Sequence, residues 1–165
     1  SGEIKVWDAA GFDKAMTLIR HGNDWIRSVS FSPDDKQLVS VCYGDKEIKV
    51  WDAATGAEII AFSGSEHPHG FSCAAFSPDG KHIVSVDWGA TIIIWDAASG
   101  NEVMNLTRQN HYIQSVSFSS DGKLLASGSR DNTIKIWDTM TGSLVKTLRG
   151  HEGLIDSVAF SPDDK

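Results

Sequence analysis

The sequence predicts an all-β protein assembled from copies of one four-stranded unit. A Trp-Asp pair recurs at intervals of about 42–44 residues, a period typical of repeat architectures. Short β-branched and aliphatic segments, such as Lys123 to Ser129 and Thr133 to Trp137, are separated by turn residues at intervals of roughly 8–12 residues. No window carries the i, i+3, i+4, i+7 apolar stripe of a helix of about ten residues, so a helical fold is excluded.

Two separate phrases recur in register and define the repeat unit. The phrase Phe-Ser-Pro-Asp, or Phe-Ser-Ser-Asp in one copy, begins at Phe31, Phe76, Phe118 and Phe160. Its proline and aspartate suit a tight turn, because proline fixes φ and aspartate bonds its own backbone. The second phrase ends in the Trp-Asp pairs, which are Trp7-Asp8, Trp51-Asp52, Trp95-Asp96 and Trp137-Asp138.

This pattern resembles the WD-repeat β-propeller family over essentially the whole chain. A blade of such a propeller is a four-stranded antiparallel sheet with two apolar faces, and blades bury those faces by stacking radially around a channel. The resemblance implies the last two strands of a blade in residues 1–20, full blades in 21–64, 65–107 and 108–149, and the first strand of a further blade in 150–165. It also implies a non-catalytic scaffold for a protein or peptide, as the recognition or adaptor part of a larger complex or multidomain signalling protein.

The expected strands amount to about four blades, whereas WD-repeat propellers usually have about seven. Alone, such a stack would expose an apolar face at each end and unpaired strand edges, which favours aggregation. We therefore expect the chain to be part of a larger ring, or to complete its ring as a homo-oligomer.

The family resemblance also assigns structural roles. In WD repeats a Trp, a Ser or Thr, a His and an Asp form a hydrogen-bonded tetrad that joins the strands of a blade, and the hydroxyl accepts the buried indole N–H. The tetrad positions are His21, Ser40, Asp45 and Trp51 in the first full blade, His67, Ser85 and Trp95 in the second, and Ser127, Asp131 and Trp137 in the third.

Two of these tetrads depart from the pattern. Gly89 occupies the Asp position of the second blade, so we expect His67 to lack an orienting acceptor and this blade to be weakened by about 1 kcal/mol or more. Gln109 occupies the His position of the third blade, with His111 two residues late.

Three alignment columns vary between copies while the strand phrases stay constant, and the resemblance places these columns at the mouth of the channel. The column directly before the tetrad Asp holds Gly44, Trp88 and Arg130. Aromatic residues and arginine dominate interface energies, although Trp25 and Trp88 have the alternative of simply filling gaps between loops. The candidate partner-binding residues are Trp25, Arg27, Tyr43, Trp88, Tyr112, Gln114, Arg130, Leu154 and Asp156.

A rival interpretation is a propeller-based metalloprotein or enzyme. His67, His69 and Cys73 have a spacing that can supply three transition-metal ligands. The simpler assignment places His67 in the tetrad, His69 in a solvated loop and Cys73 in a strand. We expect no catalytic residue, because each Ser of a His-Ser-Asp set should lie inside a strand with its hydroxyl bonded to Trp. We also expect no cofactor.

Charge and composition narrow the partner class. The formal charge is −7 and the pI about 5.2, which favours protein partners and disfavours a nucleic-acid-associated scaffold. The longest aliphatic run, residues 92–94, is far shorter than a membrane span of about 20 residues, so we expect no membrane partner. Two cysteines, Cys42 and Cys73, make no disulfide framework and favour a reducing cytoplasmic or nuclear compartment.

Overall fold

The computed structural model describes residues 2–7, 15–18, 25–43, 46–63, 70–106 and 111–164, with the backbone alone for 15–18. The described residues contain β-strands and turns, and none of them lies in a helix that is long and apolar enough to span a bilayer. The strands are β1 (Ile4–Trp7), β2 (Ala15–Leu18), β3 (Ile26–Phe31), β4 (Gln37–Cys42), β5 (Ile48–Asp52), β6 (Glu58–Phe62), β7 (Phe71–Phe76), β8 (His82–Asp87), β9 (Ile92–Asp96), β10 (Glu102–Leu106), β11 (Ile113–Phe118), β12 (Leu124–Ser129), β13 (Ile134–Asp138) and β14 (Leu144–Leu148).

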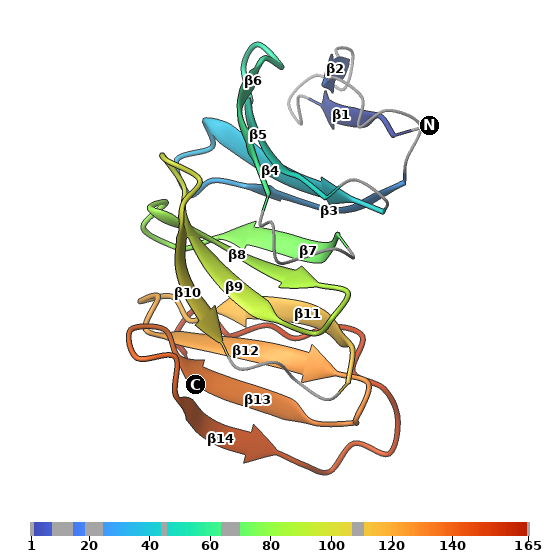
Figure 1. Cartoon of the computed structure of the whole chain (residues 1–165), viewed down its shortest axis with the longest axis vertical. Helices are drawn as coiled ribbons and strands as arrows, with labels where there is room; N and C mark the ends of the chain where they lie inside the picture. Colours follow the sequence, from blue (N-terminus) through green and yellow to red (C-terminus); the bar gives the residue numbers. More distant parts are fainter. Residues whose placement is uncertain are drawn as a thin grey trace.

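The strands form three four-stranded antiparallel sheets and one pair, each in simple chain order. The sheets are β3 to β6, β7 to β10 and β11 to β14, and β1 pairs with β2. Figure 1 shows the sheets stacked in sequence along the long axis, from the blue β1–β2 pair to the red β14. β7 contacts both β3 and β11, so the first strands of the three full sheets lie side by side. This is the arrangement expected of consecutive propeller blades, and it confirms the all-β prediction.

The core lies between the blades. One apolar cluster joins the second sheet to the first, with Val41, Ile48 and Phe62 from one side and Phe71 and Trp95 from the other. A second cluster joins β7–β10 to β11–β14, and a third packs Ile4 of β1 on Leu38 and Trp51. Because each middle sheet is covered on both faces, strand β9 is buried continuously from Ile92 to Trp95.

In the three Trp-Asp pairs whose Asp the structure describes, the Asp caps the turn that follows it. The Oδ1 atom of Asp52 accepts hydrogen bonds from the N–H of Thr55 at 2.7 Å and from its hydroxyl at 2.7 Å. Asp96 does the same with Ser99, and Asp138 with Thr141. These bonds lower the pKa of all three carboxyls below the ordinary value of 3.8. The repeated aspartate is therefore a turn-forming residue.

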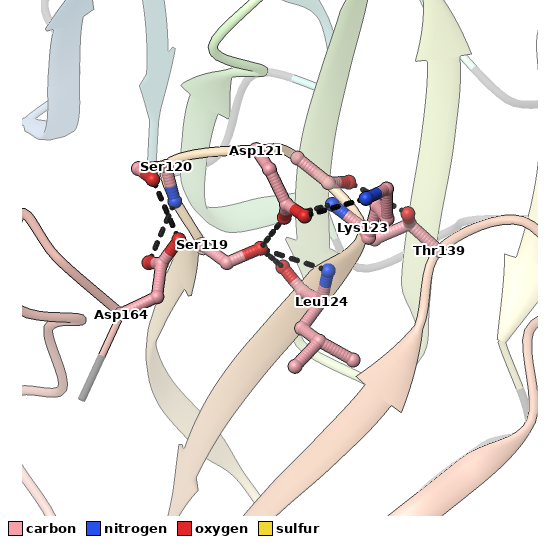
Figure 2. A network of polar contacts seen from close by, with 8 residues as sticks. Ser119, Ser120, Asp121, Lys123, Leu124, Thr139 and Asp164 are labelled. Carbon is pink, nitrogen blue, oxygen red and sulfur yellow. Dashed lines mark hydrogen bonds and ion pairs between the residues drawn. The ribbon is translucent and has the colours of Figure 1, made fainter.

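Consecutive blades also touch through the turns between their first and second strands. Pro33 lies 3.6 Å from the position that a Cβ on Gly80 would take, and Pro78 lies 3.5 Å from that of Gly122. The next copy has Ser120 in place of proline, and its contact is polar: the Asp164 carboxylate accepts the Ser120 N–H at 2.8 Å and the hydroxyl at 2.6 Å. Figure 2 shows Asp164 facing Ser120 beside the Asp121 turn. A series of turn contacts thus links the blades at one end of the strands.

The expected strand after residue 150 is not formed. Residues 154–160 have no ladder partner in the described part of the chain. Their Val158 and Phe160 N–H groups instead meet the hydroxyls of Ser115 and Ser117 on β11, at 3.2 and 3.4 Å. The segment meets β11 through serine hydroxyls and not through the backbone groups that form a ladder, so it packs against β11 without becoming a strand.

Candidate partner-binding site

Buried Trp–Ser hydrogen bonds hold the middle of each full blade. The indole N–H donates to the serine hydroxyl at 2.7 Å in Trp51–Ser40, 2.8 Å in Trp95–Ser85 and 2.9 Å in Trp137–Ser127. All six side chains are buried. Among the other tetrad positions, His21, Asp45 and His67 lie outside the described residues, as do Gln109 and His69.

Asp131 is the one tetrad aspartate within the described residues, and it organises the turn before β13. It accepts the Thr133 N–H at 3.0 Å and the Lys135 ammonium at 3.2 Å, and it also bonds the Thr133 hydroxyl. Burial raises the pKa of the Asp131 carboxyl, but these hydrogen bonds outweigh burial and leave the pKa below 3.8.

The second blade carries a carboxylate in the equivalent place in spite of Gly89. The buried Asp87 accepts the N–H of Thr91 at 2.7 Å, and Thr91 is the counterpart of Thr133. Its carboxylate oxygens lie 3.2 and 3.3 Å from the position that a Cβ on Gly89 would take. Asp87 therefore fills the space that the side chain of residue 89 would need, while the expectation that His67 lacks an acceptor stays a prediction, because His67 lies outside the described residues.

The pairing of the first two strands of each full blade contains a β-bulge. The register of the first two strands shifts between Ile26 and Ser28, between Phe71 and Cys73, and between Ile113 and Ser115. The residue inside each shift is Arg27, Ser72 or Gln114, and these three residues occupy the same position of the repeat. Bulges commonly redirect a side chain beside a functional site. A cavity of about 310 Å³ runs along these strands, and Arg27, Ser72, Gln114 and Asp156 all line it.

One backbone hydrogen bond recurs in all three full blades, and it corrects the alignment of Gly44 with Trp88 and Arg130. The N–H groups of Tyr43, Trp88 and Arg130 donate to the carbonyls of Trp25, Gly70 and Tyr112, at 2.8, 3.1 and 2.9 Å. Tyr43, and not Gly44, is thus the counterpart of Trp88 and Arg130. The reason is one extra residue between the paired Ser and Trp of the first full blade, where the separation is 11 residues and not 10.

The mouth side chains form a continuous aromatic belt with two arginines on it. The Trp88 ring meets Tyr43 edge-on at 5.6 Å between centroids and Tyr112 at 6.1 Å. The Arg27 guanidinium lies 5.1 Å from the Trp88 centroid, and that of Arg130 lies 5.5 Å from the Tyr112 centroid. The structure therefore brings five predicted site residues, from three blades, into one group, which we call the mouth cluster: Arg27, Tyr43, Trp88, Tyr112 and Arg130.

The remaining predicted site residues surround the mouth cluster. Trp25 is 75% exposed, and Leu154 is also largely exposed. Gln114 and Asp156 line the cavity below. Within the mouth cluster, Trp88 is half-buried, and its indole N–H is fully buried with no acceptor among the described residues. A buried donor without a partner costs free energy. Such donors are therefore uncommon in folded proteins, and each one calls for an explanation.

Of the three proposed metal ligands, only Cys73 lies within the described residues of the chain. No group of three His, Cys, Asp or Glu side chains suited to a metal occurs among those residues, and His67 and His69 lie outside them. Burial raises the pKa of the Cys73 thiol to about 12, which disfavours the thiolate that metals bind.

Sequence reasoning missed a second hollow, at the opposite end of the strands. A groove of about 450 Å³ between the second and third full blades is lined by Val103, Met104, Phe118 and Met140, with Asp79, Asp121 and Asp138 also lining it. Met140 is 87% exposed, whereas other copies have alanine at this position, Ala54 and Ala98. That difference between copies is the signal that would have found the groove.

Comparison with known proteins identifies the repeat. The family model of the WD domain, G-beta repeat, matches residues 12–52, 59–96, 100–138 and 142–165.

Several curated proteins are similar to this chain over part of their length. WD repeat and SOCS box-containing protein 1 of Danio rerio is 30% identical over 96 residues, which are 58% of this chain and 22% of the relative. Nuclear distribution protein PAC1-1 of Uncinocarpus reesii is 36% identical over 81 residues, 49% of this chain and 18% of the relative. Protein tipD of Dictyostelium discoideum is 29% identical over 115 residues, 68% of this chain and 19% of the relative. The chain thus spans about a fifth of the length of the curated relatives it matches.

Proposed function

This chain belongs to the WD-repeat family, and from that premise we propose that it is a rigid, non-catalytic scaffold that binds a protein or peptide partner at its channel mouth. WD-repeat domains serve in general as protein-interaction scaffolds. The proposal places the binding surface of this chain at the mouth cluster together with Trp25.

The mouth cluster is the observation that carries the proposal. Tyr43, Trp88 and Tyr112 come from separate blades yet form one belt of edge-to-face rings, with exposed Arg27 and Arg130 stacked on it. Trp, Tyr and Arg are the side chains that contribute most to binding energy at protein interfaces. The packed blades position them before a partner arrives, which limits the entropy lost on binding.

The non-catalytic assignment rests on the state of the blade serines. Ser40, Ser85 and Ser127 are buried, and each hydroxyl already accepts an indole N–H. A hydroxyl held in this way inside a strand cannot approach a substrate as a nucleophile. Measuring the metal content of the purified chain by mass spectrometry tests the rival assignment, because stoichiometric zinc or copper would favour it.

The free thiols of Cys42 and Cys73 support a reducing compartment, so we place the protein in the cytoplasm or nucleus. As part of the same proposal, the chain is the recognition or adaptor part of a larger complex. Its ring is completed by the rest of a longer propeller or by further copies of the chain.

Selection of a random peptide display library on the purified chain tests the proposal. Selected peptides should bind the Trp25→Ala variant at least tenfold more weakly, because this exposed ring supplies contact area without supporting the core. Met140→Ala, at the opposite end of the strands, is the matched control and should bind them unchanged. Peptides that bind Trp25→Ala and a Tyr112→Ala variant as tightly as the original chain would contradict a mouth site.

A further inference from the structure

The mouth carries positive charge on a chain that is acidic as a whole. The formal net charge is −7, yet the two side chains stacked on the belt are both arginines. Arg27 and Arg130 are exposed, and neither is paired with a carboxylate in the part of the chain that the structure describes. Some lysines elsewhere, in contrast, are paired with carboxylates, as Lys123 is with Asp121 at 3.0 Å and Lys135 with Asp131 at 3.2 Å.

Each guanidinium lies against an aromatic ring and is still exposed to a partner. The Arg27 guanidinium carbon lies over the Trp88 ring at 5.1 Å from its centroid and that of Arg130 over the Tyr112 ring at 5.5 Å, and both side chains are exposed. The N–H donors of a guanidinium lie in its plane, where they form a fork that matches the two oxygens of a carboxylate. Both arginines are thus fixed against a ring while their N–H groups remain available to a partner.

We propose that the mouth binds an acidic peptide segment, in which carboxylate side chains pair with Arg27 and Arg130 and an apolar side chain lies on Trp25 and Tyr43. This inference rests on the proposed function and adds the chemistry of the partner. Asp156 lines the cavity that Arg27 also lines. Because like charges repel, we expect the carboxylates of the peptide to pair with the arginines on the side away from Asp156. The overall negative charge repels a polyanion such as nucleic acid but leaves room for one or two carboxylates at this local positive patch.

The test uses peptides selected on the purified chain from a random display library, and measures their affinity for defined variants. We expect selected peptides to contain Asp or Glu near an apolar residue, and replacement of that acid by Asn or Gln to weaken binding about tenfold. Arg27→Gln and Arg130→Gln should weaken the acidic peptide by a similar factor and leave its amide version unchanged. Lys36→Gln, which removes an exposed positive charge at the opposite end of the strands, is the matched control and should have no effect.

The possible results separate the two proposals. Neutral or basic peptides that depend on Trp25 but not on either arginine would overturn the acidic specificity and leave the mouth site standing. Peptides that ignore Trp25 and both arginines would overturn both. Displacement of a selected peptide by a single-stranded oligonucleotide at equal concentration would show that the arginines recognise phosphate in nucleic acid, which also overturns the proposal.

Discussion

The carboxylate of Asp87 occupies the space beside Gly89 that an aspartate at position 89 would otherwise fill, with 3.2 Å between an Asp87 oxygen and the place of a Cβ on residue 89. It also accepts the N–H of Thr91 at 2.7 Å, as Asp131 accepts that of Thr133 in the next blade. The carboxylate that organises this turn therefore comes from a residue two positions earlier in the second full blade than in the third, yet it accepts the equivalent N–H group.

This exchange predicts that restoring the repeat pattern will destabilise the protein. Gly89→Asp puts a second carboxylate against the buried Asp87, so like-charge repulsion and crowding should cost about 1–2 kcal/mol of unfolding free energy. Asp87→Ala should cost about 2 kcal/mol, because the Thr91 N–H loses its acceptor. The double variant should cost less than the sum of the two, as measured by urea denaturation. Strictly additive costs would show that the two positions do not share one site.

The two kinds of tryptophan should respond differently to loss of the indole N–H. Trp95→Phe removes the buried hydrogen bond from the indole N–H to the Ser85 hydroxyl, so it should lower the free energy of unfolding by about 2–3 kcal/mol. Trp88→Phe removes an N–H that has no acceptor among the described residues, and should cost less than about 1 kcal/mol. Chemical denaturation of both variants compares them directly. Equal costs would mean that the Trp88 N–H contributes a bond that the structure does not show.

The repeat period predicts the blades because every copy faces the same physical demand. A four-stranded sheet between two neighbours must be apolar on both faces, and the run from Ile92 to Trp95 shows this in the sequence and in the structure. The Ser–Trp bonds follow from the same regularity, since their separation of 10 or 11 residues spans two adjacent antiparallel strands.

Aligning the copies residue by residue fails where a side chain contacts a residue that occupies another position of the repeat. It treats Gly89 as a lost carboxylate, because alignment cannot show that the end of β8 brings Asp87 to the same place. It matches Gly44 with Trp88, because one extra residue in a turn shifts the register by one position. The stacking of Arg27 and Arg130 on particular rings is likewise a property of neighbouring blades, which no single repeat contains.

The contact between Ser120 and Asp164 leads to a prediction about paired substitutions at these two residues. Other copies place proline at the position of Ser120, so Ser120→Pro also restores the repeat pattern. It should nevertheless lower stability by about 1 kcal/mol, because proline has no N–H to donate to the Asp164 carboxylate. Adding Asp164→Gly should recover the loss, since proline facing glycine is the contact found at Pro78 and Gly122, and since Asp164 has a left-handed φ of 55°. Thermal denaturation measures both changes. A double variant less stable than Ser120→Pro alone would contradict the exchange.

The turn carboxylates predict a loss of stability in acid. The N–H of Lys123, its ammonium group and the Ser119 hydroxyl together lower the pKa of Asp121 from 3.8 to about 2. A carboxyl whose pKa is lower in the folded chain stabilises the fold above its unfolded pKa, and that contribution is lost as the pH falls. Stability should therefore decline between about pH 4 and pH 2, and the pKa values of Asp34 and Asp79, which are also lowered, deepen the decline.

Urea denaturation between pH 2 and pH 6 checks this with two variants. Asp121→Asn should be less stable than the original chain at pH 6 and should approach it towards pH 2, because only the charged carboxylate provides the bonds that are lost. Asp35→Asn is the matched control, since Asp35 is exposed and its side chain makes no hydrogen bond within the described residues. It should follow the original chain throughout. A constant difference between Asp121→Asn and the original chain over the whole pH range would show that the charge on Asp121 does not support the turn.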